Sequence, residues 1–158
     1  MEYRGNDAEM DQPTFSDILD VCHEMRAELN CDFAAIAIQD EVGTDIKWPY
    51  ASGNRNEKYK RITVRYGKGI AGKVISTGRP MMISDLSNDK SSMVLEHPIM
   101  LAEQLLSAYS VPLLINGTAK GALLAGNRSS HLFTENEQNS IAKYVNKLEV
   151  MFNSNHSL

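Results

Sequence analysis

Two amphipathic helices are predicted near the two ends of the chain. Thr14 and Asp17 form a capping-box pattern, and apolar residues at helical spacing follow it as far as Leu29. Thr134 and Glu137 repeat that pattern ahead of a second stripe. The two stripes consist of Phe15, Ile18, Leu19, Cys22, Met25 and Leu29, and of Ile141, Tyr144, Val145, Leu148, Met151 and Phe152. Each helix therefore has one apolar face to bury against other elements.

The chain between these helices has the pattern of short strands. Residues 32–40 and 46–52 predict two strands joined by a turn, because both are largely apolar runs bounded by polar residues. Apolar residues alternate with polar ones over residues 62–66, which predicts a half-buried strand or extended segment. Residues 80–85 predict a further short strand.

The clearest local signal is a β-hairpin near the C-terminus. Residues 108–115 and 119–126 are apolar runs that flank Asn116-Gly117, a strong signal for a two-residue hairpin turn. Pro112 lies inside the first run and has no N–H to donate to a neighbouring strand. We therefore expect this strand to be an edge strand or to be bulged at Pro112.

Two short helices are predicted between the strands. Residues 67–78 (GKGIAGKVISTG) are bounded by glycine and predict about two helical turns. Residues 97–106 predict a second helix, in which Pro98 takes a first-turn position where a missing N–H has no cost. Residues 86–96 between them predict a polar loop.

This order of elements predicts an α+β domain with a central, mostly antiparallel sheet. We expect the N- and C-terminal helices on one face, and the short helices and loops around a ligand pocket on the other. Residues 13–153 form the predicted domain, residues 1–12 a flexible leader and residues 154–158 a disordered tail. A chain of 158 residues suits one such domain.

Composition and charge exclude several classes of protein. The 16 basic and 20 acidic residues are spread without long runs, so no basic stripe for nucleic acid is present. No apolar run approaches the roughly 20 residues of a membrane helix, and the first residues lack the apolar segment of a signal peptide. Cys22 and Cys31 are too few for a secreted disulfide framework. We therefore expect a cytoplasmic protein with reduced thiols and neither nucleic acid nor membrane as a partner.

Three glycines raise the possibility of a dinucleotide site. Gly67, Gly69 and Gly72 spell G-x-G-x-x-G, and Asp85 ends the following strand, as in a dinucleotide-binding fold. However, the helix after the glycines is too short for a parallel crossover. The preceding strand, residues 61–65, is alternating and charged instead of continuously apolar. These features favour another role for the motif.

The residues and their order resemble a GAF domain over about residues 14–152. The resemblance lies in Gly67–Val74 (GKGIAGKV), the following Thr77–Pro80 (TGRP) and Ile83–Asp85 (ISD) segments, the hairpin, and the final Phe133–Glu135 (FTE) helix start. This likeness implies the fold, whereas one fold hosts many activities. Trp48, the GKGIAG turn and the His97-Pro98-Ile99 helix start further resemble the GAF receptors that bind nitrate.

That resemblance implies a site for nitrate and no cofactor. The backbone N–H groups of Ile70, Ala71 and Ile99 and the indole N–H of Trp48 are the implied donors, because helix N-termini and indoles donate to anions. Met100 replaces Ile99 if the alignment shifts by one residue. His97 either lines the site with its ring or is an exposed histidine at the helix start. Trp48 is alternatively a packed aromatic of its strand.

The resemblance implies a sensor without catalytic activity. It predicts that the protein binds nitrate and modulates a cytosolic, oxygen-sensing histidine kinase. GAF enzymes that reduce free methionine sulfoxide need reactive cysteines near the pocket, and residues 80–115 contain none. Alternatives are a GAF domain that binds another small molecule such as a cyclic nucleotide, and a structural module that dimerises through its first and last helices. A homodimer fits either kind of function.

Overall fold

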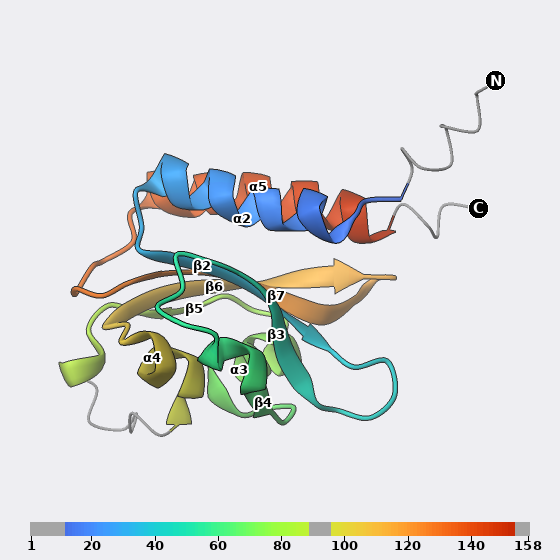
Figure 1. The fold of residues 1–158 in the computed structure, drawn as a ribbon, viewed down its shortest axis with the longest axis horizontal. Coiled ribbons are helices and arrows are strands. Elements are labelled where there is room, and N and C mark those ends of the chain that lie inside the picture. Colours follow the sequence, from blue (N-terminus) through green and yellow to red (C-terminus); the bar gives the residue numbers. More distant parts are fainter. Residues whose placement is uncertain (1–11, 89–95, 154–158) are drawn as a thin grey trace.

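The computed structural model describes residues 12–88 and 96–153 of the chain (Figure 1). Three predictions fall largely on other residues. The predicted leader, apart from Gln12, and the predicted tail lie outside the described residues. So does the segment 89–95 of the predicted polar loop.

Six strands form one sheet in the order β4-β3-β2-β7-β6-β5, and every neighbouring pair is antiparallel. The strands are β2 (Phe33–Gln39), β3 (Ile46–Ser52), β4 (Thr63–Val64), β5 (Met81–Ile83), β6 (Ser107–Ile115) and β7 (Thr118–Asn127). The central strand β2 is buried on both faces, which explains why its sequence FAAIAI is apolar without alternation. The predicted α+β architecture with an antiparallel sheet is confirmed.

Two long helices, α2 (Phe15–Leu29) and α5 (Glu135–Asn153), lie side by side on one face of the sheet (Figure 1). Both predicted capping boxes are formed. The backbone N–H of Asp17 donates to Thr14 Oγ1 at 3.1 Å, and that of Glu137 donates to Thr134 Oγ1, also at 3.1 Å. Apart from Phe15, which is 57% exposed, the residues of the two apolar stripes pack on the sheet in one of two core clusters. This confirms the predicted location of the terminal helices.

The opposite face carries the short helices α3 (Gly69–Thr77) and α4 (Pro98–Glu103), with the 3₁₀ turns η1 (Lys58–Arg61) and η2 (Leu86–Asn88) (Figure 1). The second core cluster lies between them and the sheet. Helix α4 is shorter than the predicted 97–106, because Gln104 adopts a left-handed conformation that ends it. The extended segment predicted over 62–66 is regular only in β4, and Tyr66 is half exposed.

The hairpin predicted around Asn116-Gly117 is formed by β6 and β7. Strand β6 is an inner strand where β5 pairs with Ala108 to Ser110, but β5 ends before Pro112. Pro112 therefore has only β7 beside it, opposite Ala122, and a register shift follows at Leu113. At Pro112 the strand is therefore locally an edge strand, as expected for a strand that contains proline.

The sheet topology contradicts the dinucleotide-binding alternative. A parallel crossover would place β4 and β5 side by side, whereas they lie at opposite edges of the sheet. Strand β4 pairs with β3, and β5 pairs with β6, both antiparallel. The glycine motif therefore opens a short helix that crosses beneath the sheet from one edge to the other.

Candidate functional site

Four of the predicted site residues meet at one narrow pocket between the sheet and the short helices. The space between its atoms amounts to about 160 Å³, and no part of it admits a water molecule. It is lined by Trp48, Val64, Gly69, Ile70, Ala71, Pro98 and Ile99. Side chains and backbone from β3, β4, α3 and α4 thus converge on one point.

Trp48 reaches the pocket because of the alternation along β3. Ile46 and Trp48 point into the core on the α3 side, whereas Lys47 between them is exposed. Trp48 is 2% exposed, so its ring is packed as well as facing the pocket. No described residue is a hydrogen-bond acceptor for its indole N–H. The two predicted roles of Trp48, core aromatic and pocket donor, are therefore geometrically compatible.

The first turn of α3 lies at the same pocket, which Gly69, Ile70 and Ala71 line. Lys68 is the N-cap, so the N–H groups of Gly69, Ile70 and Ala71 have no partner within the helix. No described residue accepts a hydrogen bond from the N–H of Ile70 or Ala71. At nine residues, α3 is long enough for its N-terminus to carry a partial positive charge.

Helix α4 supplies a single donor, and the structure distinguishes the two candidates for it. The N–H of Met100 donates to the carbonyl oxygen of His97 at 2.9 Å, and the Met100 side chain is buried in the core. Pro98 has no N–H. The N–H of Ile99 is therefore the one in this turn that remains for a ligand. With six residues, α4 is too short for us to assign a dipole effect to its end.

His97 is not exposed, which makes one of its two predicted environments wrong. It is fully buried as the N-cap residue of α4. Nor does it belong to the residues that line the narrow pocket. It directly precedes the turn that contributes Ile99 and Met100 to the core.

Sequence reasoning missed the contact that holds α4 in place. Arg128, just after β7, donates to the backbone oxygen of Glu103 at 2.9 Å and to its carboxylate at 2.7 Å. The same carboxylate accepts the N–H of Arg55 at 2.8 Å, and Arg128 also reaches the oxygen of Gly53. A single acidic residue at the end of the apolar segment PIMLAE was the signal available.

The two cysteines lie on the opposite face of the sheet, in the core beneath α2 and α5. Burial raises the pKa of the Cys22 thiol to about 12 and that of the Cys31 thiol to about 11. A thiolate nucleophile is thus disfavoured at both positions. In the described part of the chain, no three metal-ligand side chains cluster, and no helix is long and apolar enough to cross a membrane.

Comparison with known proteins places this geometry in a family. The profile of the GAF domain matches residues 12–147. No curated protein sequence matches the chain. Among solved structures, NreA of Staphylococcus aureus, mutated in its nitrate binding site, is 36% identical with a TM-score of 0.64, covering 70% of this chain and 83% of that chain. A second structure of mutated NreA is 31% identical with a TM-score of 0.70, covering 80% and 98%.

Two further structures set the range of this similarity. A hypothetical protein of S. aureus, SA1058, is 35% identical with a TM-score of 0.65, covering 70% of this chain and 92% of that chain. The free methionine-R-sulfoxide reductase of Neisseria meningitidis has a TM-score of 0.73 over 90% of this chain and 80% of that chain, but is 15% identical. The reductase therefore shares the fold alone.

Proposed function

The chain belongs to the GAF domain family, and we propose that it is a receptor for nitrate, bound in the narrow pocket beside Trp48. The observation that carries the proposal is the convergence of unpaired N–H donors. Trp48, the first turn of α3 and Ile99 all line this pocket, and each carries an N–H group that could donate to an anion there. Similarity to NreA, a protein described as having a nitrate binding site, supports the same ligand.

The chemistry of the pocket suits a small, weakly hydrated anion. None of its lining residues is charged. There is therefore no carboxylate to repel an anion, and no cation that would favour a strongly basic anion over a weakly basic one. An anion moved into apolar surroundings needs hydrogen bonds to offset its lost hydration. Nitrate is planar and carries one charge over three oxygens, which matches several neutral donors arranged around it.

The size of the pocket disfavours larger ligands. Pockets for drug-sized molecules have volumes of about 300–1,000 Å³, whereas this pocket does not admit even a water molecule. A cyclic nucleotide would have to displace core side chains such as Ile70. Even nitrate requires the pocket to widen slightly. Binding therefore favours a conformation in which α3 and α4 stand further apart.

Calorimetry with nitrate at low chloride tests the proposal. Trp48→Phe removes the indole N–H and keeps an aromatic ring, so we expect an affinity at least about tenfold lower, as for loss of a hydrogen bond to a charged group. Tyr59→Phe is the matched control, because Tyr59 is a buried aromatic of the same core cluster that does not line the pocket. Its affinity should stay within about twofold of the parent.

Two results would contradict the nitrate site. One is an absence of both binding heat and thermal stabilisation in the parent protein at millimolar nitrate. The other is an equal loss of affinity in Trp48→Phe and Tyr59→Phe, which would mean that any change in this core weakens binding. Acetate and chloride, measured in parallel, show whether the pocket selects planar anions.

We further propose that the receptor acts in the cytoplasm on an oxygen-sensing histidine kinase and is not itself an enzyme. A ligand shifts such a complex only through different affinities for two conformations, and the widening of the pocket supplies such a difference. The purely structural alternative needs an apolar seam on α2 and α5, but their outer surface carries the cross-helix pairs Glu24–Lys147 and Glu28–Lys143. This role would be contradicted if the protein left the rate of kinase autophosphorylation unchanged, both with and without nitrate.

A further inference from the structure

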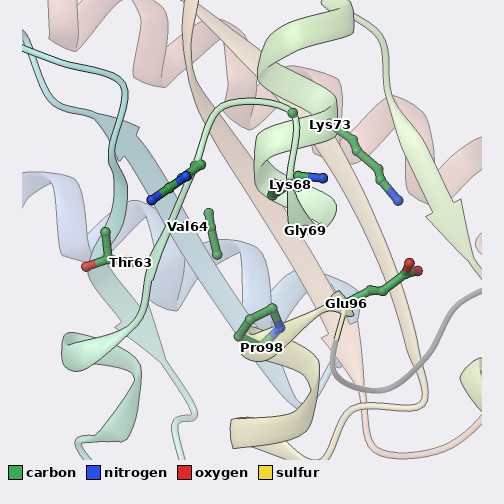
Figure 2. A pocket seen from close by; sticks show the side chains of 9 residues that line it. Thr63, Val64, Lys68, Gly69, Lys73, Glu96 and Pro98 are labelled. Atoms are coloured by element: carbon green, nitrogen blue, oxygen red, sulfur yellow. The ribbon is translucent and has the colours of Figure 1, made fainter.

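A second, larger cavity opens on the protein surface beside the narrow pocket (Figure 2). Its volume is about 390 Å³, and Figure 2 shows the Lys73 and Glu96 side chains extending into it toward one another. The residues that line it are Thr63, Val64, Arg65, Gly67, Lys68, Gly69, Lys73, Glu96 and Pro98. It therefore lies over the glycine turn that opens α3.

Positive charge is concentrated around this cavity. Arg65, Lys68 and Lys73 line it together with a single carboxylate, that of Glu96, although the whole chain has a formal net charge of −4. Arg65 and Lys68 are exposed and Lys73 is half-buried. A concave surface lined with one sign of charge raises the local concentration of oppositely charged small ions.

The same cavity lacks the fixed donors of a tight phosphate site. The N–H of Gly67 donates to the oxygen of Gly72 at 3.1 Å, and the N–H of Lys68 donates to that of Arg65 at 2.9 Å. The turn therefore uses these N–H groups internally and does not present them as a cradle. Flexible cationic side chains without such a cradle attract anions but hold them weakly.

The two cavities share one wall. Val64, Gly69 and Pro98 line both of them. A Cβ atom at Gly69 would lie 3.5 Å from the oxygen of Glu96, 3.7 Å from Val64 Cγ1 and 3.8 Å from Pro98 Cδ. Gly69, which has no side chain, thus lies between Val64 and Pro98 in this shared wall and leaves a seam between them.

We propose that the surface cavity is the entrance to the narrow pocket: its cations gather the anion, and the seam between Val64 and Pro98 is the gate through which it passes. This inference rests on the proposed function and adds the route and its control to that site. Cations in the entrance act on the rate of association, because they attract the ion before it is desolvated. The gate acts equally on entering and leaving, because both pass through the same seam.

Stopped-flow kinetics with nitrate at low ionic strength test the entrance, with the fluorescence of Trp48, the one tryptophan of the chain, as the signal. The double variant Lys68→Gln/Lys73→Gln should lower the association rate constant about threefold to tenfold and leave dissociation nearly unchanged. Lys120→Gln is the control, because Lys120 is exposed on β7 and lines neither cavity. The difference from the control should disappear near 1 M salt, where screening is strong.

Val64→Ala tests the gate. Opening the seam should raise both the association and the dissociation rate constants, each by about twofold or more. Thermal unfolding verifies that the variants are folded. The inference is overturned if the parent binds nitrate but the lysine variant behaves like Lys120→Gln, or if Val64→Ala changes dissociation alone. If the parent does not bind nitrate, the proposed function fails, and the entrance fails with it.

Discussion

The carboxylate of Glu103 and the guanidinium of Arg128 lie 2.7 Å apart, and the Glu103 side chain is completely buried. This pair joins the end of α4 to the end of β7. Because Ile99 lies in the same short helix, the position of its N–H depends on an ion pair outside the pocket. The ion pair thus contributes both to the stability of the fold and to the position of α4 at the candidate site.

Removing Arg128 should be more damaging than removing both charges. Arg128→Met leaves a buried carboxylate without its cation, and we expect the free energy of unfolding to fall by about 3–5 kcal/mol. The double variant Arg128→Met/Glu103→Gln should recover part of that loss, because a neutral amide still accepts the N–H of Arg55. Urea unfolding of the parent, of Arg128→Met, of Glu103→Gln and of the double variant measures both effects. Additive losses would show that the two residues are not coupled.

Two glycines with the same backbone angle should respond differently to alanine. Gly53 and Gly117 both have a φ of 80°, a left-handed conformation that disfavours side chains. A Cβ at Gly53 would lie 2.2 Å from the backbone oxygen of Asp32, whereas one at Gly117 would have no atom within 4 Å. Gly117→Ala should therefore cost about 1 kcal/mol, and Gly53→Ala about 3 kcal/mol or more. Equal losses in chemical denaturation would contradict this difference in packing.

Glu28 should stabilise the contact between α2 and α5 in a defined range of pH. Hydrogen bonds from Lys143 and Tyr144 lower the pKa of Glu28 from 4.5 to about 2. Because the carboxylate is favoured in the folded state, its contribution is present above about pH 4.5 and is lost as the pH falls toward 2. The group is partly exposed, so the contribution is of the order of 1 kcal/mol or less.

Unfolding of the parent and of Glu28→Gln, measured from pH 7 to pH 2.5, checks this range. The difference between the two proteins should be full at pH 7 and should shrink to a small part of that value by pH 2.5. Glu24→Gln is the control, because the pair of Glu24 with Lys147 is also exposed but is joined by no tyrosine. A difference for Glu28→Gln that stays constant down to pH 2.5 would contradict the assigned shift.

The two cysteines should be nearly inert in the folded protein. With thiol pKa values of about 12 for Cys22 and about 11 for Cys31, only a minute fraction of either thiol is ionised at pH 8. We expect labelling by a thiol-reactive disulfide reagent to be at least about a hundredfold slower than in denaturant. Cys31→Ala separates the two sites. Rapid labelling of the native protein would contradict the raised pKa values of the two thiols.

The parts of the fold that were predicted correctly depend on residues close together in the chain. The capping boxes at Thr14 and Thr134 form between residues three apart, and the Asn116-Gly117 turn joins adjacent strands. The apolar stripes likewise reflect the helical period within one element. Such patterns carry the order of the elements and, with the glycine motif, the resemblance to the family.

The ends of the short elements were predicted less well, because no residue in the sequence marks where they end. Helix α4 ends at Glu103 because Gln104 turns into a left-handed conformation, which no glycine or asparagine signalled. The alternation of Ile62, Val64 and Tyr66 is that of a strand, yet only Thr63 and Val64 pair with β3. Pairing stops after Val64 because β3 begins at Ile46, and it starts only at Thr63 because the 3₁₀ turn η1 runs to Arg61. The pattern of residues 62–66 contains neither limit.

The sequence by itself determined the α+β order of elements, the antiparallel hairpin and the presence of helix starts near Ile70 and Ile99. Only the tertiary structure decided that these starts face Trp48 across one pocket, that the N–H of Met100 is already used by His97, and that a basic cavity lies outside. The physical reason is the range of the interactions. Helix periods and turns arise between near neighbours, whereas a site arises when packing brings together groups whose separation in the chain leaves no pattern.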